Sequence, residues 1–281
     1  MGNEPYSGRT LKLTLEYDGT AYVGWQRQPE GVSIQALLED ALAAFEGGPV
    51  TVHGAGRTDA GVHAIGQVAS VRTRASHDVA TLHRALNAVL PLDVRVVAVE
   101  DAAPGFHARY DAITKTYEYR VVNAPYASAF AHRYVWHVPG ALDVAAMRAG
   151  ATVLVGRHDF AAFRALGGDA ATTERTILSL DLEVGSDPTR GSGESSGPEN
   201  RAFSDRGLTP AGLLTLRIVG DGFLRHMVRT IAGTLVDVGL GRWPADHVAR
   251  ILAGRDRAAA GRAAPPSGLF LMAVGYPVEP I

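Results

Sequence analysis

The chain has 281 residues, of which 46% are hydrophobic and 20% are charged, a composition typical of a soluble globular protein with one large domain or two smaller ones. It contains no cysteine, which excludes disulfide bonds, thiolate zinc sites and a cysteine nucleophile. The formal net charge of −2 gives no sign of a strongly basic nucleic-acid-binding domain. Residues 1–12 hold no apolar core of signal-peptide length, and no apolar run is long enough to cross a membrane, so we expect a cytoplasmic protein.

The first predicted elements are a strand and a helix. Apolar residues alternate with polar ones from Leu11 to Tyr17, which predicts a half-buried strand. An aromatic, amide-rich loop follows at Tyr22–Pro29, and it is either a capping loop with a core tryptophan or a lip that faces a substrate. Ser33 then fits the N-cap of a helix whose apolar residues lie on one face, and Gly47 fits its end.

A glycine-rich segment, His53–Gln67, joins two β-branched runs that both predict strands. Four of its fifteen residues are glycine, and Arg57 and Asp59 stand between them. Glycine permits positive φ and close approach of another backbone, at an entropic cost in the folded state. We therefore predict a tight loop that presents a carboxylate.

Several functions compete for this loop. A dinucleotide fingerprint would need a third glycine where Asp59 stands, and no Gly-Lys-Ser/Thr follows, so phosphate binding is disfavoured. A metal site made of His53, Asp59 and His63 lacks a second cluster or a helical i, i+4 pair. A surface Arg–Asp pair and a catalytic carboxylate kept ionised by an arginine both remain open, because spacing does not separate them.

A second helix is predicted at 78–90 and a strand at 94–99. The first part of the chain therefore has the order strand, helix, strand, strand, helix, strand, which is the ferredoxin-like arrangement. Pro104-Gly105 is the expected boundary between an N-terminal half, 1–104, and a C-terminal half, 105–281.

The C-terminal half begins with a long strand in which Lys115, Tyr117 and Tyr119 share one face. The tyrosines are either half-buried with wet hydroxyls or a platform on which bases stack. A helix is predicted at 143–154, followed by a strand whose inward residues are Leu178, Leu180, Leu182 and Val184. Residues 185–207 are rich in Gly, Ser, Pro and charge, which predicts a flexible insert.

The last predicted elements are a strand at 214–218, a helix that begins near Met227, a short helix at 247–253 and a final strand that ends at Tyr276. In the long helix the apolar residues face inward. Arg225 and Arg229 are spaced i, i+4 and place cations along one flank. For such a pair, a solvated surface is the default interpretation.

Four separated motifs carry a resemblance to a known family. The segment Gly54–Ala64 (GAGRTDAGVHA) resembles the signature of the tRNA pseudouridine synthase A family. The segments Lys115–Tyr119, Phe223–Arg229 and Ala264–Tyr276 are similar to further motifs of that family and occur in the expected order. A further segment, Phe106–Ala112, also resembles a motif of the family, with one departure at Asp111, where the family more often has serine.

The resemblance implies a fold and a reaction. The implied fold is α+β, with two ferredoxin-like (RNP-like) halves whose antiparallel and mixed sheets adjoin around a central basic cleft. The implied enzyme is an isomerase that converts uridine to pseudouridine at positions 38–40 of the tRNA anticodon stem-loop. It implies no cofactor and no metal, tRNA as the partner, and a homodimer.

The resemblance also implies roles for individual residues. Asp59 is expected to initiate chemistry at the ribose, by attack on C1′ or through a glycal. Tyr117 is expected to stack on the target uracil, and Arg229 to pair with Asp59. The expected substrate-binding residues are Arg57, Tyr117, His63, Arg109 and Arg225.

Overall fold

The structure is a computed structural model that describes residues 8–165, 167, 170–185 and 212–277. It divides into two compact units. Unit 1 comprises residues 1–115 and 270–281, and unit 2 comprises residues 116–269. This division differs from the boundary expected at Pro104-Gly105, because the last strand of the chain pairs with a strand of unit 1.

The described residues of unit 1 form five strands and two α-helices. They are β1 (Arg9–Tyr17), α1 (Ile34–Glu46), β2 (Val52–Gly54), β3 (His63–Thr73), α2 (Val79–Val89), β4 (Val94–Ala102) and, from Phe270 onward, β10 (Leu269–Gly275). β1 lies between β3 and β4 and is antiparallel to both, and β2 is antiparallel to β3. The order β4-β1-β3-β2 is the ferredoxin-like arrangement predicted from the sequence. β10 runs parallel to β3, with Phe270 opposite His63.

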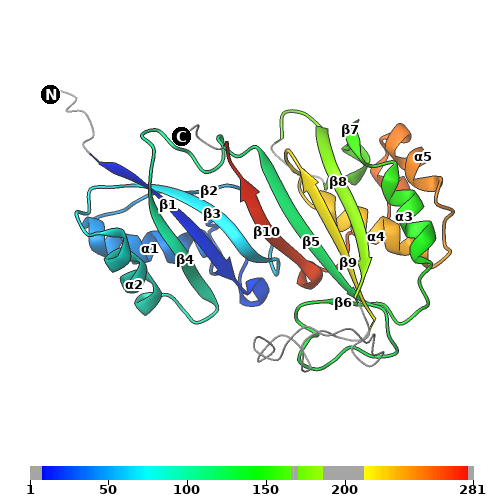
Figure 1. Cartoon of the computed structure of the whole chain (residues 1–281), viewed down its shortest axis with the longest axis horizontal. Helices are drawn as coiled ribbons and strands as arrows, with labels where there is room; N and C mark the ends of the chain where they lie inside the picture. The colour runs from blue at the N-terminus through cyan, green and yellow to red at the C-terminus, as the bar shows by residue number, and fades with distance from the viewer. Residues whose placement is uncertain (1–7, 166, 168–169, 186–211, 278–281) are drawn as a thin grey trace, which may run out of the picture. The chain divides into compact units, whose positions relative to one another are not determined.

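The two helices of unit 1 begin and end where their capping residues predict. The Ser33 side chain accepts the N–H of Ala36 at the start of α1, and Gly47 ends that helix with a left-handed φ of 68°. Asp78 caps α2 in the same way through the N–H of Thr81. The helices lie side by side in Figure 1 and bury Leu38, Leu42, Leu82 and Leu86, while β1 buries its alternating apolar residues.

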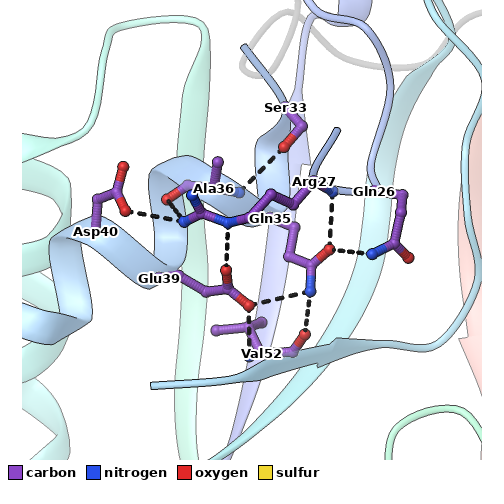
Figure 2. A network of polar contacts seen from close by, with 8 residues as sticks. All are labelled: Gln26, Arg27, Ser33, Gln35, Ala36, Glu39, Asp40 and Val52. Carbon is purple, nitrogen blue, oxygen red and sulfur yellow. Dashed lines mark hydrogen bonds and ion pairs between the residues drawn. The ribbon is translucent and has the colours of Figure 1, made fainter. Parts of the chain in front are cut away.

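Polar side chains of α1 hold two neighbouring segments in place (Figure 2). The Gln35 amide donates to the carbonyl of Val52 on β2 and accepts from the Gln26 amide and the Arg27 N–H. Glu39 accepts from the Val52 N–H at 3.1 Å and from the Arg27 guanidinium at 2.8 Å. These contacts fix the end of the 22–29 loop and the start of β2 against the same helix.

Apart from two short strands and a final helix, unit 2 repeats the strand–helix–strand–strand–helix order with which unit 1 begins. Its elements are β5 (Thr114–Val122, from Thr116), β6 (Trp136–His137), α3 (Val144–Thr152), β7 (Gly156–Asp159), β8 (Glu174–Val184), β9 (Leu213–Gly220), α4 (Met227–Gly239) and α5 (His247–Gly254). The strand order is β5-β9-β8-β7, and β6 pairs with β5. The β5-β9-β8 part corresponds to β1-β3-β2 of unit 1, so both units use one pattern and the chain is α+β, as predicted.

Two sequence predictions in unit 2 are wrong. Leu178 and Val184 were expected to face inward, but they are 53% and 56% exposed. The pairing of β8 with β9 shifts register between Ile177 and Ser179, which turns Ile177 into the core instead of Leu178. Arg225 was expected on the long helix, but α4 begins at Met227, after His226 with φ 60°.

The helix α4 is also more buried than an amphipathic pattern predicts. Each of its residues except Arg229 is buried. Gly233 allows the chain at Arg262 to approach, because a Cβ there would lie 1.9 Å from the Arg262 carbonyl oxygen. The backbone at Arg229 therefore belongs to a closely packed helix.

The predicted flexible insert at 185–207 lies outside the described residues except for Gly185. Among the helices that the structure describes, none has the length and apolarity to cross a membrane.

Candidate active site

The backbone of the glycine-rich loop is hydrogen-bonded to the 22–25 segment. Residues 55–62 connect β2 to β3, and we call them the Asp59 loop. Asp59 forms an antiparallel bridge with Gly24. The Trp25 N–H donates to the carbonyl of Thr58 at 3.0 Å, and the Gly61 N–H donates to the carbonyl of Tyr22 at 3.3 Å. These bonds on both sides of Asp59 restrict its main chain.

Glycines make this close approach possible. Gly24 has φ +105°, and a Cβ on it would lie 2.5 Å from the carbonyl oxygen of Thr58. A Cβ on Gly54 would lie 2.4 Å from the Trp25 ring, which is 2% exposed. Trp25 is therefore the core tryptophan of a capping loop, the first of the two interpretations of this segment.

Buried side chains support the Asp59 loop from below. The Tyr17 hydroxyl lies 2.8 Å from Oγ1 of Thr58. The Gln67 amide Nε2 donates to the carbonyl of Gly56 at 2.9 Å and to the Tyr17 hydroxyl at 3.4 Å. Burial raises the pKa of Tyr17 to about 12, so the hydroxyl stays neutral at physiological pH. Because these side chains bond residues on both sides of Arg57, they hold the loop that carries Asp59.

His63 lies in the core rather than at the surface. It is 1% exposed, and its ring stacks on Phe270 with centroids 4.7 Å apart. Its Nδ1 atom lies 3.1 Å from both the Gly19 nitrogen and Oδ1 of Asp18, so the tautomer decides which of these it bonds. A ring enclosed in this way positions the chain at the end of the Asp59 loop.

The two charged side chains of the loop are more accessible. Asp59 is partly exposed and Arg57 is exposed, whereas Thr58 between them is buried. A carboxylate that reaches solvent from a restrained backbone can act as a nucleophile or as a general base. Arg109, another expected binding residue of unit 1, is exposed beside Tyr110, with its guanidinium carbon 5.9 Å from the ring centroid.

Unit 2 holds the other expected site residues. The Tyr117 ring packs edge-to-face on Phe223 with centroids 5.2 Å apart, and Tyr117 is 7% exposed. Arg229 is partly exposed. Its Nε atom donates to the carbonyl of Ala264 at 2.7 Å, and its own carbonyl accepts the Ala264 N–H at 2.9 Å. Arg225 is exposed in the segment before α4.

The expected residues thus fall into two groups. Asp59, Arg57 and His63 share the Asp59 loop or its end, and Arg109 lies elsewhere in unit 1. Tyr117, Arg225 and Arg229 belong to unit 2.

Sequence reasoning missed the supporting residues Gly24, Tyr17 and Gln67. The alternation of β1 indicated that Tyr17 is buried, but nothing in the sequence indicated its partner.

Metal binding by the Asp59 loop has no structural support. Within residues 8–165, 167, 170–185 and 212–277, no group of three or more His, Asp or Glu side chains is placed to hold a metal ion. The Nδ1 atom of His63 is engaged with either Gly19 or Asp18, according to its tautomer.

The fold and the loop together define a class: α+β proteins with a ferredoxin-like unit that presents a carboxylate from a glycine-rich connection between two paired strands. The family described as tRNA pseudouridine synthase matches this chain over residues 14–111 and 151–277. The chain belongs to the tRNA pseudouridine synthase family.

Close relatives cover nearly the whole chain. A tRNA pseudouridine synthase A from Syntrophotalea carbinolica is 44% identical over 95% of this chain and 96% of its own length. One from a Geobacter species is 43% identical over 96% and 99%, respectively. One from Cereibacter sphaeroides is 44% identical over 95% and 96%.

Proposed function

We propose that this chain is an isomerase that converts uridine to pseudouridine in tRNA, with Asp59 as the residue that initiates the reaction. Family membership supports the reaction. The observation that supports Asp59 is its restrained loop: Gly24 bridges Asp59, Trp25 bonds Thr58 on one side and Tyr22 bonds Gly61 on the other, while Asp59 stays partly exposed.

The reaction exchanges one bond to the base for another. The bond from ribose C1′ to N1 of uracil breaks, the base turns, and C1′ forms a bond to C5. The C5 proton then leaves and N1 takes up a proton, so the product is an isomer of the substrate and no electrons are gained or lost. In the proposed mechanism Asp59 either attacks C1′ directly or removes a ribose proton on a glycal route.

Residues of unit 2 complete the proposed mechanism. Tyr117 contacts the uracil, and its packing on Phe223 keeps the ring in one orientation. Arg229 pairs with Asp59 and keeps the carboxylate ionised and aimed. Its two hydrogen bonds with Ala264 and the burial of the rest of α4 favour such a fixed role.

Three exposed arginines, Arg57, Arg109 and Arg225, are proposed to bind the phosphates and nucleotides of the substrate. Arginine suits this role because its planar group forms bidentate bonds to phosphate. His63 is 1% exposed, so we assign it to positioning of the Asp59 loop rather than to direct contact with RNA.

The substrate position and the assembly are also part of the proposal. We infer that the uridines at positions 38–40 of the anticodon stem-loop are modified, that the base is flipped out of its stack to be reached, and that the chain acts as a cytoplasmic homodimer. These inferences rest on the resemblance of the motifs to those of the family. Analytical ultracentrifugation of the purified chain tests the dimer, since a monomer at assay concentrations contradicts it.

The decisive experiment measures tritium release from [5-³H]uridine-labelled tRNA. The wild type should release tritium, and Asp59→Asn should release none while it still binds tRNA. Asp246→Asn is the matched control. Asp246 forms an exposed ion pair with Arg250 at the start of α5, so this variant should behave as the wild type. If the wild type binds tRNA without release, the chain is an RNA-binding module and the enzyme proposal is wrong. Binding of ATP or NAD would instead favour a nucleotide-dependent enzyme.

A further inference from the structure

A groove of about 700 Å³ lies in unit 1, at the end of β2 opposite the Asp59 loop. Cationic and aromatic side chains are prominent in its lining, with Arg72, Arg74, His53, Phe106 and His107 among them. β2 carries His53 and then leads into the Asp59 loop. The groove is therefore connected to the candidate catalytic residue by one short strand.

Three aromatic rings follow one another outward from the lining of this groove, with successive planes tilted by 32° and 34°. The His53 and His107 centroids are 4.8 Å apart, and the His107 and Tyr110 centroids are 4.3 Å apart. Tyr110, at the outer end, is 75% exposed. The ring is contacted by His107 and has the Arg109 guanidinium carbon 5.9 Å from its centroid, yet most of Tyr110 remains in water and can contact a further flat group.

The turn that carries the outer two rings is held in one conformation. The Ala108 N–H donates to Oγ of Ser70 at 3.0 Å, and the Tyr276 hydroxyl donates to the Ala108 carbonyl at 2.7 Å. The Asp111 carboxylate accepts the N–H of His107 at 2.8 Å. The carboxylate that departs from the family pattern is therefore engaged with the turn itself, and the turn presents Tyr110 without reorganisation.

The hydrogen-bonding state of His107 follows from its neighbours. Its Nδ1 atom accepts the N–H groups of Arg109 at 3.1 Å and Tyr110 at 3.4 Å. Burial and the adjacent His53 lower the pKa of His107, so the ring is neutral at pH 7 and carries its proton on Nε2. This ring contributes an N–H donor beside the groove.

The acidic residue of the groove is occupied. The Glu46 carboxylate accepts from the Thr73 hydroxyl, from the Arg74 N–H at 3.0 Å and from the Ala75 N–H at 3.2 Å. It bonds the backbone that follows β3, and the nearby Arg74 charge helps to lower its pKa. The groove thus holds two guanidinium groups, of Arg72 and Arg74, against this one carboxylate, together with an imidazole donor.

We propose that this groove binds an unpaired nucleotide of the RNA substrate, with its base stacked on Tyr110 and its phosphate against Arg72, Arg74 and His107. A stacking ring next to cations is the arrangement with which proteins hold single-stranded RNA. The inference rests on the proposed function, because it supplies a second point of attachment for the strand that reaches Asp59.

The test compares two RNAs by fluorescence anisotropy: a short hairpin with an unpaired loop and a fully paired duplex of equal length. Tyr110→Ala should raise the Kd for the hairpin about 5- to 100-fold and leave the Kd for the duplex nearly unchanged. Tyr110→Phe keeps the ring and should bind as wild type. Tyr126→Ala removes a tyrosine of similar exposure, 78%, in unit 2 and serves as the control.

A second measurement addresses the phosphate. Arg72→Gln should reduce the slope of log Kd against log salt concentration by about 0.7–0.9, whereas Arg84→Gln, outside the groove lining, should not. The inference is overturned if Tyr110→Ala binds the hairpin like the wild type, or if Tyr126→Ala weakens binding equally. Tritium release by the wild type is measured in parallel, and its absence contradicts the proposed function. If the wild type releases tritium but Tyr110→Ala binds the hairpin unchanged, only the proposal for the groove is contradicted.

Discussion

Replacement of Gly24 by alanine should impair catalysis more than it impairs folding. At φ +105° an alanine is strained by about 1–3 kcal/mol. Its Cβ would also lie 2.5 Å from the Thr58 carbonyl oxygen, so one of the two segments must shift by roughly 0.9 Å or more to restore an ordinary contact. Overpacking of this kind costs about another 1–3 kcal/mol. Since Gly24 pairs directly with Asp59, the shift moves the carboxylate, and a displacement near 1 Å can cost about 100-fold in rate.

The assay is tritium release under saturating tRNA, together with thermal unfolding, at a temperature where each variant is folded. Gly47→Ala is the matched control, because Gly47 has φ +68° and a Cβ there meets nothing within 4 Å. It should lose some stability and keep its kcat. If Gly24→Ala retains kcat within about threefold of Gly47→Ala, the bridge does not position Asp59 and the reasoning is refuted.

Three further changes test other parts of the structure. Burial raises the pKa of Tyr17 from 10.0 to about 12, so its stabilising effect is complete below pH 10 and is lost as pH rises toward 12. The free energy of unfolding of Tyr17→Phe should therefore fall less between pH 10 and 12 than that of the wild type, by up to about 2.7 kcal/mol; parallel curves in denaturant titrations would contradict this. Burial opposes ionisation of Glu46, but hydrogen bonds from Thr73, Arg74 and Ala75 lower its pKa overall. Glu46→Ala should thus lower the free energy of unfolding by about 1–3 kcal/mol at neutral pH. In acid the variant should lose little, because the wild type itself loses this contribution as pH falls through the lowered pKa of Glu46. An equal loss of stability at both pH values would argue against an ionised Glu46. Gly233→Ala should destabilise unit 2 and reduce kcat, because its Cβ would lie 1.9 Å from the Arg262 carbonyl oxygen in the segment that binds Arg229; unchanged melting would show that this segment yields freely.

The regular part of the fold could be predicted because it depends on local patterns. Ser33 and Gly47 bound α1 where capping chemistry requires, and the alternation from Leu11 to Tyr17 gave the correct buried face of β1. Leu178 was placed on the wrong side because one register shift reverses the outward and inward positions of a strand. Arg225 was placed on α4 because the sequence does not mark where this helix begins. The N-cap residue with the left-handed conformation is His226, not a glycine.

Of the candidate site, only the charged residues of the loop could be predicted from the sequence. Asp59 and Arg57 stand in a motif that can be read directly from the chain. The residues that restrain them come from elsewhere: Gly24 and Trp25 from a loop, and Tyr17 and Gln67 from two strands. Such contacts join positions that are distant in sequence, and no local pattern specifies them. The burial of His63 could not be predicted for the same reason, since its stacking partner Phe270 belongs to the last strand.

The return of the chain to unit 1 has a consequence for the order of folding during synthesis. Unit 1 is interrupted by the whole of unit 2, and β10 adds to the edge of β3 beside the Asp59 loop. The ribosome therefore completes unit 2 before it makes Phe270, the residue on which the His63 ring stacks. Domains fold as they emerge, so the nascent chain carries an unfinished sheet edge next to its candidate catalytic loop until translation of β10. Competence for RNA modification would then arise at the end of synthesis, and a prematurely terminated chain would be inactive even with the Asp59 motif intact.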